Sequence, residues 1–321
     1  MKRRDFLKGV ACGGLLLAAD VPSALAQPFA RQQKAMPPEA VGILYDATLC
    51  IGCKACVAAC KEHNSMPPDF STTDQLWDNA IDLSGKTLNI IKLYTHGAGA
   101  AKDREDGFSF VKRQCMHCID PSCVSACPVS ALTKDPKSGI VSYNKGACLG
   151  CRYCQVACPY NIPKFEWDAP FPQIRKCQLC SHRIKEGGYA ACCEFCPTGA
   201  SLFGTTKDLL EEARYRLTLK PGEEYGFPVG RIGSRETSHR TVEAVYQPRI
   251  YGEKEGGGTQ VLMLAGVPFD KLGMPKLSET SDAARSEGLQ HMIYRGMIAP
   301  IALLGGLLYA VHRSTKNNDD R

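Results

Sequence analysis

Four groups of four cysteines constrain this chain more than any other feature of its sequence. In the first and third groups, two, two and three residues separate successive cysteines, and the second group differs only in a middle gap of four. The fourth group opens with the same Cys-x2-Cys pair, and eleven residues precede its final Cys-x3-Cys. The groups are Cys50, Cys53, Cys56 and Cys60; Cys115, Cys118, Cys123 and Cys127; Cys148, Cys151, Cys154 and Cys158; and Cys177, Cys180, Cys192 and Cys196.

This spacing suits iron–sulfur cubanes. Three thiolates on one tight loop can bind three irons of a cubane, and a fourth thiolate three residues further on reaches a neighbouring cubane. Bacterial ferredoxins use such a run, followed by proline, with the fourth cysteine on the other cluster. Proline follows the last cysteine of three groups, at Pro128, Pro159 and Pro197, whereas Lys61 takes this place in the first group. The sixteen cysteines therefore predict four [4Fe-4S] clusters.

Two adjacent cysteines in the fourth group leave a choice of ligand. Every other group has three residues between its last two cysteines, and this spacing selects Cys192 to accompany Cys196. Cys193 is then a spare thiol.

Zinc and disulfides are the alternatives to clusters. A structural zinc site usually takes two Cys-x2-Cys pairs, and a third cysteine inside each run leaves too many thiols per loop. Disulfides would suit an exported protein, but four repeats of one cluster-binding spacing argue against a disulfide framework. A membrane-tethered zinc-binding adaptor stays as an alternative hypothesis.

The two ends of the chain predict export and membrane anchoring. Residues 1–26 combine basic residues, an apolar stretch and the small-residue site Ala24-Leu25-Ala26, and their Arg3-Arg4 pair resembles a twin-arginine leader. Residues 292–311 are apolar and long enough to span a bilayer, with a buried core helix as the alternative. Basic residues follow in the tail 312–321, which by the positive-inside rule is cytoplasmic. The body of the protein is then periplasmic.

Composition excludes one class of function. The net charge is +6, and the leader accounts for a surplus of two basic residues, so the mature chain carries +4. This surplus is too small to indicate nucleic-acid binding. The 321 residues leave room for two domains, and a hydrophobic content of 44% is that of a globular protein.

Local patterns predict further elements around the cysteines. We expect strands at 41–45, 108–112, 200–203 and 261–264, a hairpin from 131 to 143, a loop at 181–191 and an amphipathic helix at 206–217. Four basic residues flank the motifs, and two interpretations are open for each: a charge that raises a nearby cluster potential or steers a partner, or a solvated surface charge, which is the more common case. They are Lys112, Arg113, Arg152 and Lys176. His117 lies between two cysteines, and we interpret it as a packing residue or a neighbour of the ligands.

Several stretches resemble one family over essentially the whole length. They are the leader, Gln114–Cys118, Lys134–Lys137 and Tyr251–Leu262. With the four motifs and the terminal anchor, they resemble the four-cluster electron-transfer subunits of membrane-bound oxidoreductases. This family includes the iron–sulfur subunits of formate dehydrogenase and dimethyl sulfoxide reductase. The last stretch carries the narrower resemblance, to the hydrogenase-2 type of [NiFe] uptake hydrogenase.

The resemblance implies which cysteines share a cluster. Motifs 1 and 4 would form one ferredoxin-like domain and motifs 2 and 3 another, each exchanging its fourth cysteines. The implied ligand sets are set A (Cys50, Cys53, Cys56 and Cys196), set B (Cys60, Cys177, Cys180 and Cys192), set C (Cys115, Cys118, Cys123 and Cys158) and set D (Cys127, Cys148, Cys151 and Cys154).

The expected fold is α+β: two interleaved two-cluster ferredoxin-like domains with insertions, and a C-terminal transmembrane helix. The expected segments are a signal peptide at 1–26, a linker at 27–40, the paired domains at 41–205 with an insertion at 61–114, an extension at 206–290, an anchor at 292–311 and a tail at 312–321.

The function implied by the resemblance is electron transfer without catalysis by this chain. Electrons from hydrogen would come from the small and large subunits of a [NiFe] hydrogenase and leave to an integral membrane subunit that reduces quinone. A molybdenum enzyme, such as a formate dehydrogenase or a sulfur-compound reductase, is the alternative partner.

Overall fold

The computed structural model describes residues 30–68, 80–96, 99 and 101–319. The leader predicted at 1–26 lies outside these residues. The chain divides into two compact units, one at 33–283 and one whose described residues are 30–32 and 284–319. Residues 30–40 of the expected linker run mostly as coil.

A three-stranded sheet lies in the core of the larger unit. Its middle strand β1 (Val41–Asp46) pairs antiparallel with β8 (Ser201–Thr205) and parallel with β11 (Val261–Leu264). Ile43 and Leu44 of β1 are fully buried, as expected for a central strand. The strands predicted at 41–45, 200–203 and 261–264 are confirmed. The pairing of β1 with β8 places the strand that leads into the first motif beside the strand that follows the fourth motif.

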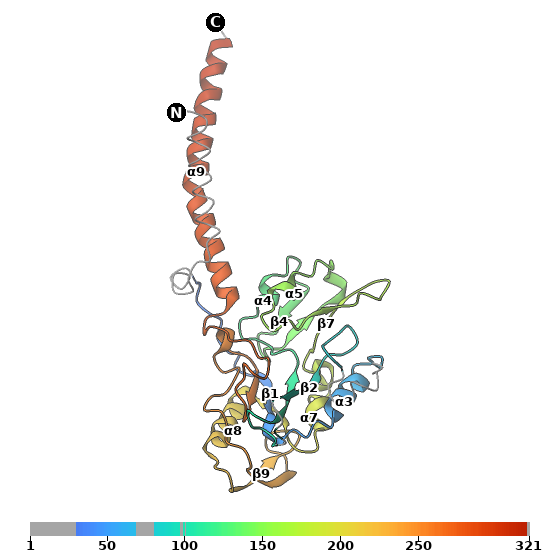
Figure 1. Ribbon diagram of the computed structural model, residues 1–321. Helices are drawn as coiled ribbons and strands as arrows, with labels where there is room; N and C mark the ends of the chain where they lie inside the picture. Colours follow the sequence, from blue (N-terminus) through green and yellow to red (C-terminus); the bar gives the residue numbers. More distant parts are fainter. Residues whose placement is uncertain (1–29, 69–79, 97–98, 100, 320–321) are drawn as a thin grey trace. The chain divides into compact units, whose positions relative to one another are not determined.

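Helices pack around this sheet. α3 (Ala55–His63) packs on α7 (Ala191–Glu194), and α8 (Thr206–Thr218) lies against β1 and β8 (Figure 1). α8 begins where the Thr205 hydroxyl accepts a hydrogen bond from the Asp208 amide at 3.2 Å, a typical N-cap. The amphipathic helix predicted at 206–217 is confirmed.

The second and third motifs form a similar arrangement. α4 (Ser122–Ser125) packs on α5 (Tyr153–Ala157), and β4 (Leu132–Lys134) pairs antiparallel with β5 (Val141–Tyr143) (Figure 1). The predicted hairpin is therefore confirmed. Gly139 closes its turn with a φ of 71°, a conformation that favours glycine.

Shorter elements complete the larger unit. They are the antiparallel pairs β2 (Ile90–Thr95) with β3 (Phe108–Arg113), β6 (Lys164–Phe165) with β7 (Ile174–Arg175) and β9 (Glu224–Pro228) with β10 (Thr237–Thr241), and the 3-10 turns η2 (Ala47–Leu49), η4 (Lys145–Ala147) and η5 (Glu255–Gly257). β3 confirms the strand predicted at 108–112. The loop expected at 181–191 is partly wrong, because it contains helix α6 (Ser181–Lys185), which starts directly after Cys180.

α9 (Asp282–Asp319) is the main element of the other unit. Its segment Asp282–His312 is long and apolar enough to cross a membrane, and its most apolar 18-residue window has a mean hydropathy of 1.5. The leucines at 303, 304 and 308 are all exposed, as expected of a helix that faces lipid. The anchor predicted at 292–311 lies within this helix, which also continues through residues 312–319.

Candidate iron–sulfur sites

The four Cys-x2-Cys loops share one backbone conformation. In each loop, the residue before the second cysteine has a positive φ: 70° at Gly52, 47° at His117, 72° at Gly150 and 53° at Leu179. This left-handed residue turns the backbone so that amides point into the loop, a geometry that binds anions. The amides of Gly52 and Gly150 accordingly each donate to the sulfur two residues earlier, at 3.4 Å.

The thiols of set A surround one cavity. Cys50, Cys53, Cys56 and Cys196 all line one space. Four cysteines around one space suit a cluster of several metal ions better than a single metal ion. Among the residues that the structure describes, no three His, Cys, Asp or Glu side chains form a group that could hold one metal ion. The donor set thus fits a [4Fe-4S] cluster.

Set B combines the last cysteine of the first motif with three cysteines of the fourth motif. The thiols of Cys192 and Cys180 lie close enough to Cys60 to raise its pKa further, after burial, the main cause. Cys60 also accepts a hydrogen bond from the Asn64 side chain at 3.7 Å. The structure thus brings the fourth cysteine of motif 1 to the cysteines of motif 4.

Sets C and D show the same exchange between motifs 2 and 3. Burial raises the pKa of Cys123 to about 12, and the neighbouring thiols that add to this shift include Cys115 and Cys158. Burial likewise raises the pKa of Cys154 to about 11, and the first neighbour is Cys127 of the other motif. Because iron binds thiolates, binding of a cationic cluster core relieves both the burial cost and the repulsion.

Successive sets also lie close enough to affect one another's pKa values. Cys192 of set B affects the pKa of Cys56 in set A, Cys115 of set C affects Cys177 in set B, and Cys154 of set D affects Cys123 in set C. The order of the sets in space is therefore A, B, C and D. All 17 described cysteines are free thiols.

Two lysines near the thiols are buried, which corrects the expectation that they are solvated surface charges. Lys112 is 3% exposed and Lys176 is 4% exposed. Lys176 donates to the carbonyl oxygens of Val141 and Cys177, and the thiols around Lys112 are described below. Sequence reasoning missed them because a lysine is rarely buried without an anionic partner, and clusters supply that partner.

The other two basic residues beside the motifs, Arg152 and Arg113, are more exposed than the two lysines. Arg152 is exposed and stacks over Trp167, with its guanidinium carbon 4.8 Å from the ring centroid. Arg113 is half-buried.

His117 is a buried neutral imidazole. Its Nδ1 accepts a hydrogen bond from the Val141 amide at 3.1 Å. Burial, with the nearby Lys176 and Lys134 ammonium groups, holds the pKa of His117 well below its usual value. A ring fixed in this way packs beside the ligands, as expected from the sequence.

The C-terminal extension also reaches the sites. The Gln260 amide donates to the Met116 carbonyl at 3.2 Å, and the Ile119 amide donates to the Gly258 carbonyl at 3.0 Å. The stretch 251–262 therefore packs against the second cysteine loop. The local sequence pattern of this stretch did not predict the contact.

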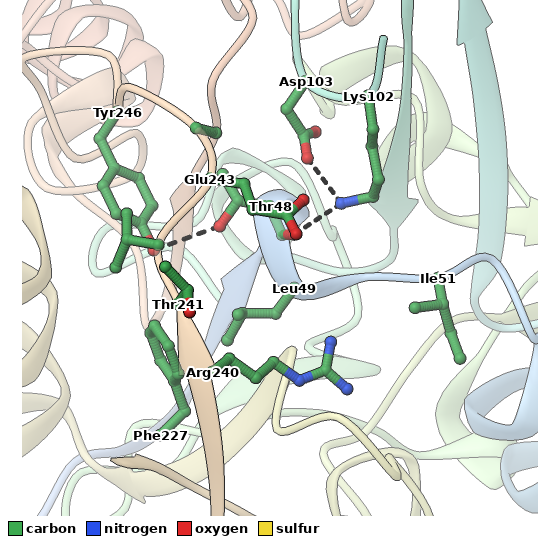
Figure 2. Close-up of a pocket in the computed structure, with 12 residues that line it drawn as sticks. Thr48, Leu49, Ile51, Lys102, Asp103, Phe227, Arg240, Thr241, Glu243 and Tyr246 are labelled. Atoms are coloured by element: carbon green, nitrogen blue, oxygen red, sulfur yellow. Dashed lines mark hydrogen bonds and ion pairs between the residues drawn. The ribbon is translucent and has the colours of Figure 1, made fainter. Parts of the chain in front are cut away.

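A cavity of about 390 Å³ lies beside the first cysteine loop (Figure 2). Ile51, which lies between Cys50 and Cys53, forms part of its lining. The Lys102 ammonium in its wall binds the Thr48 carbonyl and the Asp103 carboxylate, both at 2.5 Å. The positive charge of Lys102 is therefore already neutralised by residues of the cavity wall.

Two matches to 4Fe-4S dicluster domains cover the cysteine groups, at residues 42–128 and 107–206. Over 323 residues, the hydrogenase-2 operon protein HybA of Escherichia coli O157:H7 is 50% identical to this chain, and the match covers 99% of this chain and 97% of that protein. The chain belongs to the HybA family.

More distant relatives of this HybA-family chain are formate dehydrogenase subunits of Escherichia coli K12. The nitrate-inducible iron–sulfur subunit is 32% identical over 272 residues, which cover 83% of this chain and 80% of that protein. The formate dehydrogenase-O iron–sulfur subunit is 35% identical over 272 residues, with 83% and 79% covered. The family resemblance, the α+β fold with two dicluster domains and the four [4Fe-4S] clusters are thus confirmed. These cofactors leave no support for the zinc-binding adaptor.

Proposed function

We propose that this HybA-family chain carries electrons from a [NiFe] hydrogenase to a quinone-reducing membrane subunit. The observation that carries this proposal is the succession of the thiol sets from A through D, each near enough to the next to affect its pKa values. When bound, four clusters in such an order supply a relay for single electrons across the subunit. The relative of 50% identity is a hydrogenase-2 operon protein, which supports a hydrogenase as the source.

The proposed ligands are the four sets that the family resemblance implies, with Cys192 rather than Cys193 in set B. The chain's own residues hold the thiolates in place and donate hydrogen bonds to them. The Ser201 amide donates to Cys196 at 3.4 Å, and the Ala131 amide donates to Cys127 at 3.1 Å. Such hydrogen bonds to sulfur raise the reduction potential of a cluster.

The domain boundaries are part of the proposal. The pairing of β1 with β8 and of α3 with α7 supports one domain from motifs 1 and 4. The pairing of β4 with β5 and of α4 with α5 supports a second from motifs 2 and 3. Both lie within 41–205, and the insertion 61–114 adds the β2–β3 pair to the first.

The proposed location is the periplasmic face of the inner membrane. The twin-arginine leader would export the folded chain, and the helix within 292–311 would anchor it. The partners are the hydrogenase small and large subunits on the periplasmic side and the integral membrane subunit that passes electrons to quinone.

A molybdenum enzyme is the second candidate partner. The formate dehydrogenase iron–sulfur subunits, at 32% and 35% identity, favour it. The same relay would then carry electrons from formate.

Membranes from a strain that lacks only this chain test the proposal. We expect hydrogen-dependent quinone reduction to be lost and to return when the chain is supplied, whereas hydrogen-dependent reduction of a soluble dye persists. Loss of formate-dependent quinone reduction, with the hydrogen-dependent rate unchanged, would support the molybdenum partner instead.

A further inference from the structure

Lys112 carries a positive charge deep inside the larger unit. It lies on β3, and its side-chain Nζ donates a hydrogen bond to the Ser201 hydroxyl at 3.0 Å. Only 3% of the residue is exposed. An ammonium group removed from water in this way needs anionic partners nearby.

The anionic partners come from two different thiol sets. Burial alone would lower the pKa of Lys112, but the neighbouring sulfurs of Cys192, Cys56 and Cys193 raise it well above its ordinary value. Cys56 belongs to set A and Cys192 to set B. The Ser201 that holds the ammonium group also donates its amide to Cys196 of set A, at 3.4 Å. Lys112 thus lies between the first two sets.

We propose that Lys112 is a positioning residue whose buried charge sets the reduction potentials of the clusters at sets A and B together. The inference rests on the ligand sets of the proposed function. Each reduction adds one negative charge to a cluster, and a nearby cation stabilises that charge strongly where water is excluded. Removal of the charge therefore lowers the potential of both neighbours.

Lys134 provides the contrast. Its Nζ donates to the Gln260 side-chain oxygen at 2.7 Å and to the Cys118 carbonyl at 3.0 Å. Burial lowers the pKa of Lys134 to about 8, and the sulfurs that oppose this shift are those of Cys118, Cys115 and Cys123, all in set C. The two lysines thus act on different clusters.

The test is a redox titration of the full-length protein in its native complex, with chemical mediators and detection by electron paramagnetic resonance. Lys112→Gln removes the charge and retains a polar side chain beside Ser201. We expect two of the four cluster potentials to fall and the other two to stay unchanged. Lys134→Gln should lower a third potential, and Lys137→Gln, at an exposed position, should change none.

Several results would overturn the proposal: unchanged potentials in Lys112→Gln, a change in one cluster only, or an equal shift in all four. If this variant loses iron, Ser201→Asp replaces it, because a carboxylate beside Nζ neutralises the same ammonium group. The same two potentials should then fall, and unchanged potentials in Ser201→Asp would exclude the proposed role.

Mediators exchange electrons with the clusters directly, so the titration does not depend on the enzyme partner. A wild-type protein with fewer than four clusters would contradict the proposed function itself. If the protein holds four clusters and none of their potentials changes in Lys112→Gln, only this inference is contradicted.

Discussion

Cys192 and Cys193 are adjacent on α7, and the sulfur of Cys192 lies near the Cys60 thiol of motif 1. Both α7 side chains are buried. The neighbouring Cys193 thiol is the main cause of a lowered pKa at Cys192, and Lys112 lowers this pKa further. Burial and the neighbouring Cys192 raise the pKa of Cys193. The two adjacent sulfurs thus have opposite pKa shifts, with the lower pKa on Cys192.

This difference predicts opposite outcomes for two serine variants. Cys192→Ser should lose one cluster, about a quarter of the iron of a protein with four [4Fe-4S] clusters. Cys193→Ser should retain all the iron, because it changes a neighbour of the ligand and not the ligand. Iron analysis of the purified proteins checks this, and iron loss only in Cys193→Ser would reverse the assignment.

The cysteine motifs could be recognised from the sequence because covalent spacing alone restricts which thiols share a loop. The short strands beside them were also predictable, since runs such as Val41–Tyr45 and Val261–Leu264 are apolar and bounded by breakers. The pairing of β11 with β1 was not predictable, because more than 200 residues separate them and no local pattern records a distant partner.

The buried lysines were misjudged for a different reason. A lysine beside a motif is usually solvated, and only the strand pairing that directs Lys112 toward α7 and β8 reveals its burial. α6 was missed because it is a single short turn of helix between Cys180 and Gly187-Gly188.

The buried ion pair between Arg216 and Asp46 predicts that substitution of Arg216 greatly lowers the stability of the fold. Their side chains are fully buried and joined at 3.0 Å, which ties α8 to the end of β1 just before the first motif. Arg216→Met leaves the Asp46 carboxylate without its cation, so the free energy of unfolding should fall by about 3–5 kcal/mol. Anaerobic denaturant titration, followed by cluster absorbance, measures this.

Arg214 is the matched control for Arg216. It pairs with Glu253 on the surface, where its side chain is 60% exposed. Arg214→Met should cost less than about 1 kcal/mol. Equal losses in the two variants would show that burial of the Arg216 pair does not matter.

Gln260 predicts a second stability effect, at the junction of the two motif pairs. Its side-chain amide donates to the carbonyls of Val41 at 2.7 Å and Ser138 at 2.8 Å. Gln260→Leu removes this donor from two partly buried carbonyls, of which that of Ser138 keeps the Val41 amide as a donor, so the cost should be about 1–3 kcal/mol. Gln247, which donates one such bond to Gly266 at 2.9 Å, is the control, and Gln247→Leu should cost less. Denaturant titration of both variants decides the point.

The apolar helix predicts a further outcome in cell fractionation. Leu304 lies near the middle of the predicted anchor, and an arginine there costs about 2.5–3.5 kcal/mol on insertion scales. Leu304→Arg should reduce the membrane-bound fraction of the chain expressed without its partners, whereas Leu304→Ala should leave most of it bound. An unchanged distribution of Leu304→Arg between membrane and soluble fractions would contradict a spanning role.

Metal analysis of the complex tests the electron-relay account most directly. The tagged chain is isolated anaerobically from membranes in mild detergent, and iron, nickel, molybdenum, tungsten and zinc are measured per chain. The account predicts iron in large excess together with stoichiometric nickel. Iron with molybdenum or tungsten would contradict the hydrogenase partner, and zinc with little iron would contradict the cluster relay itself.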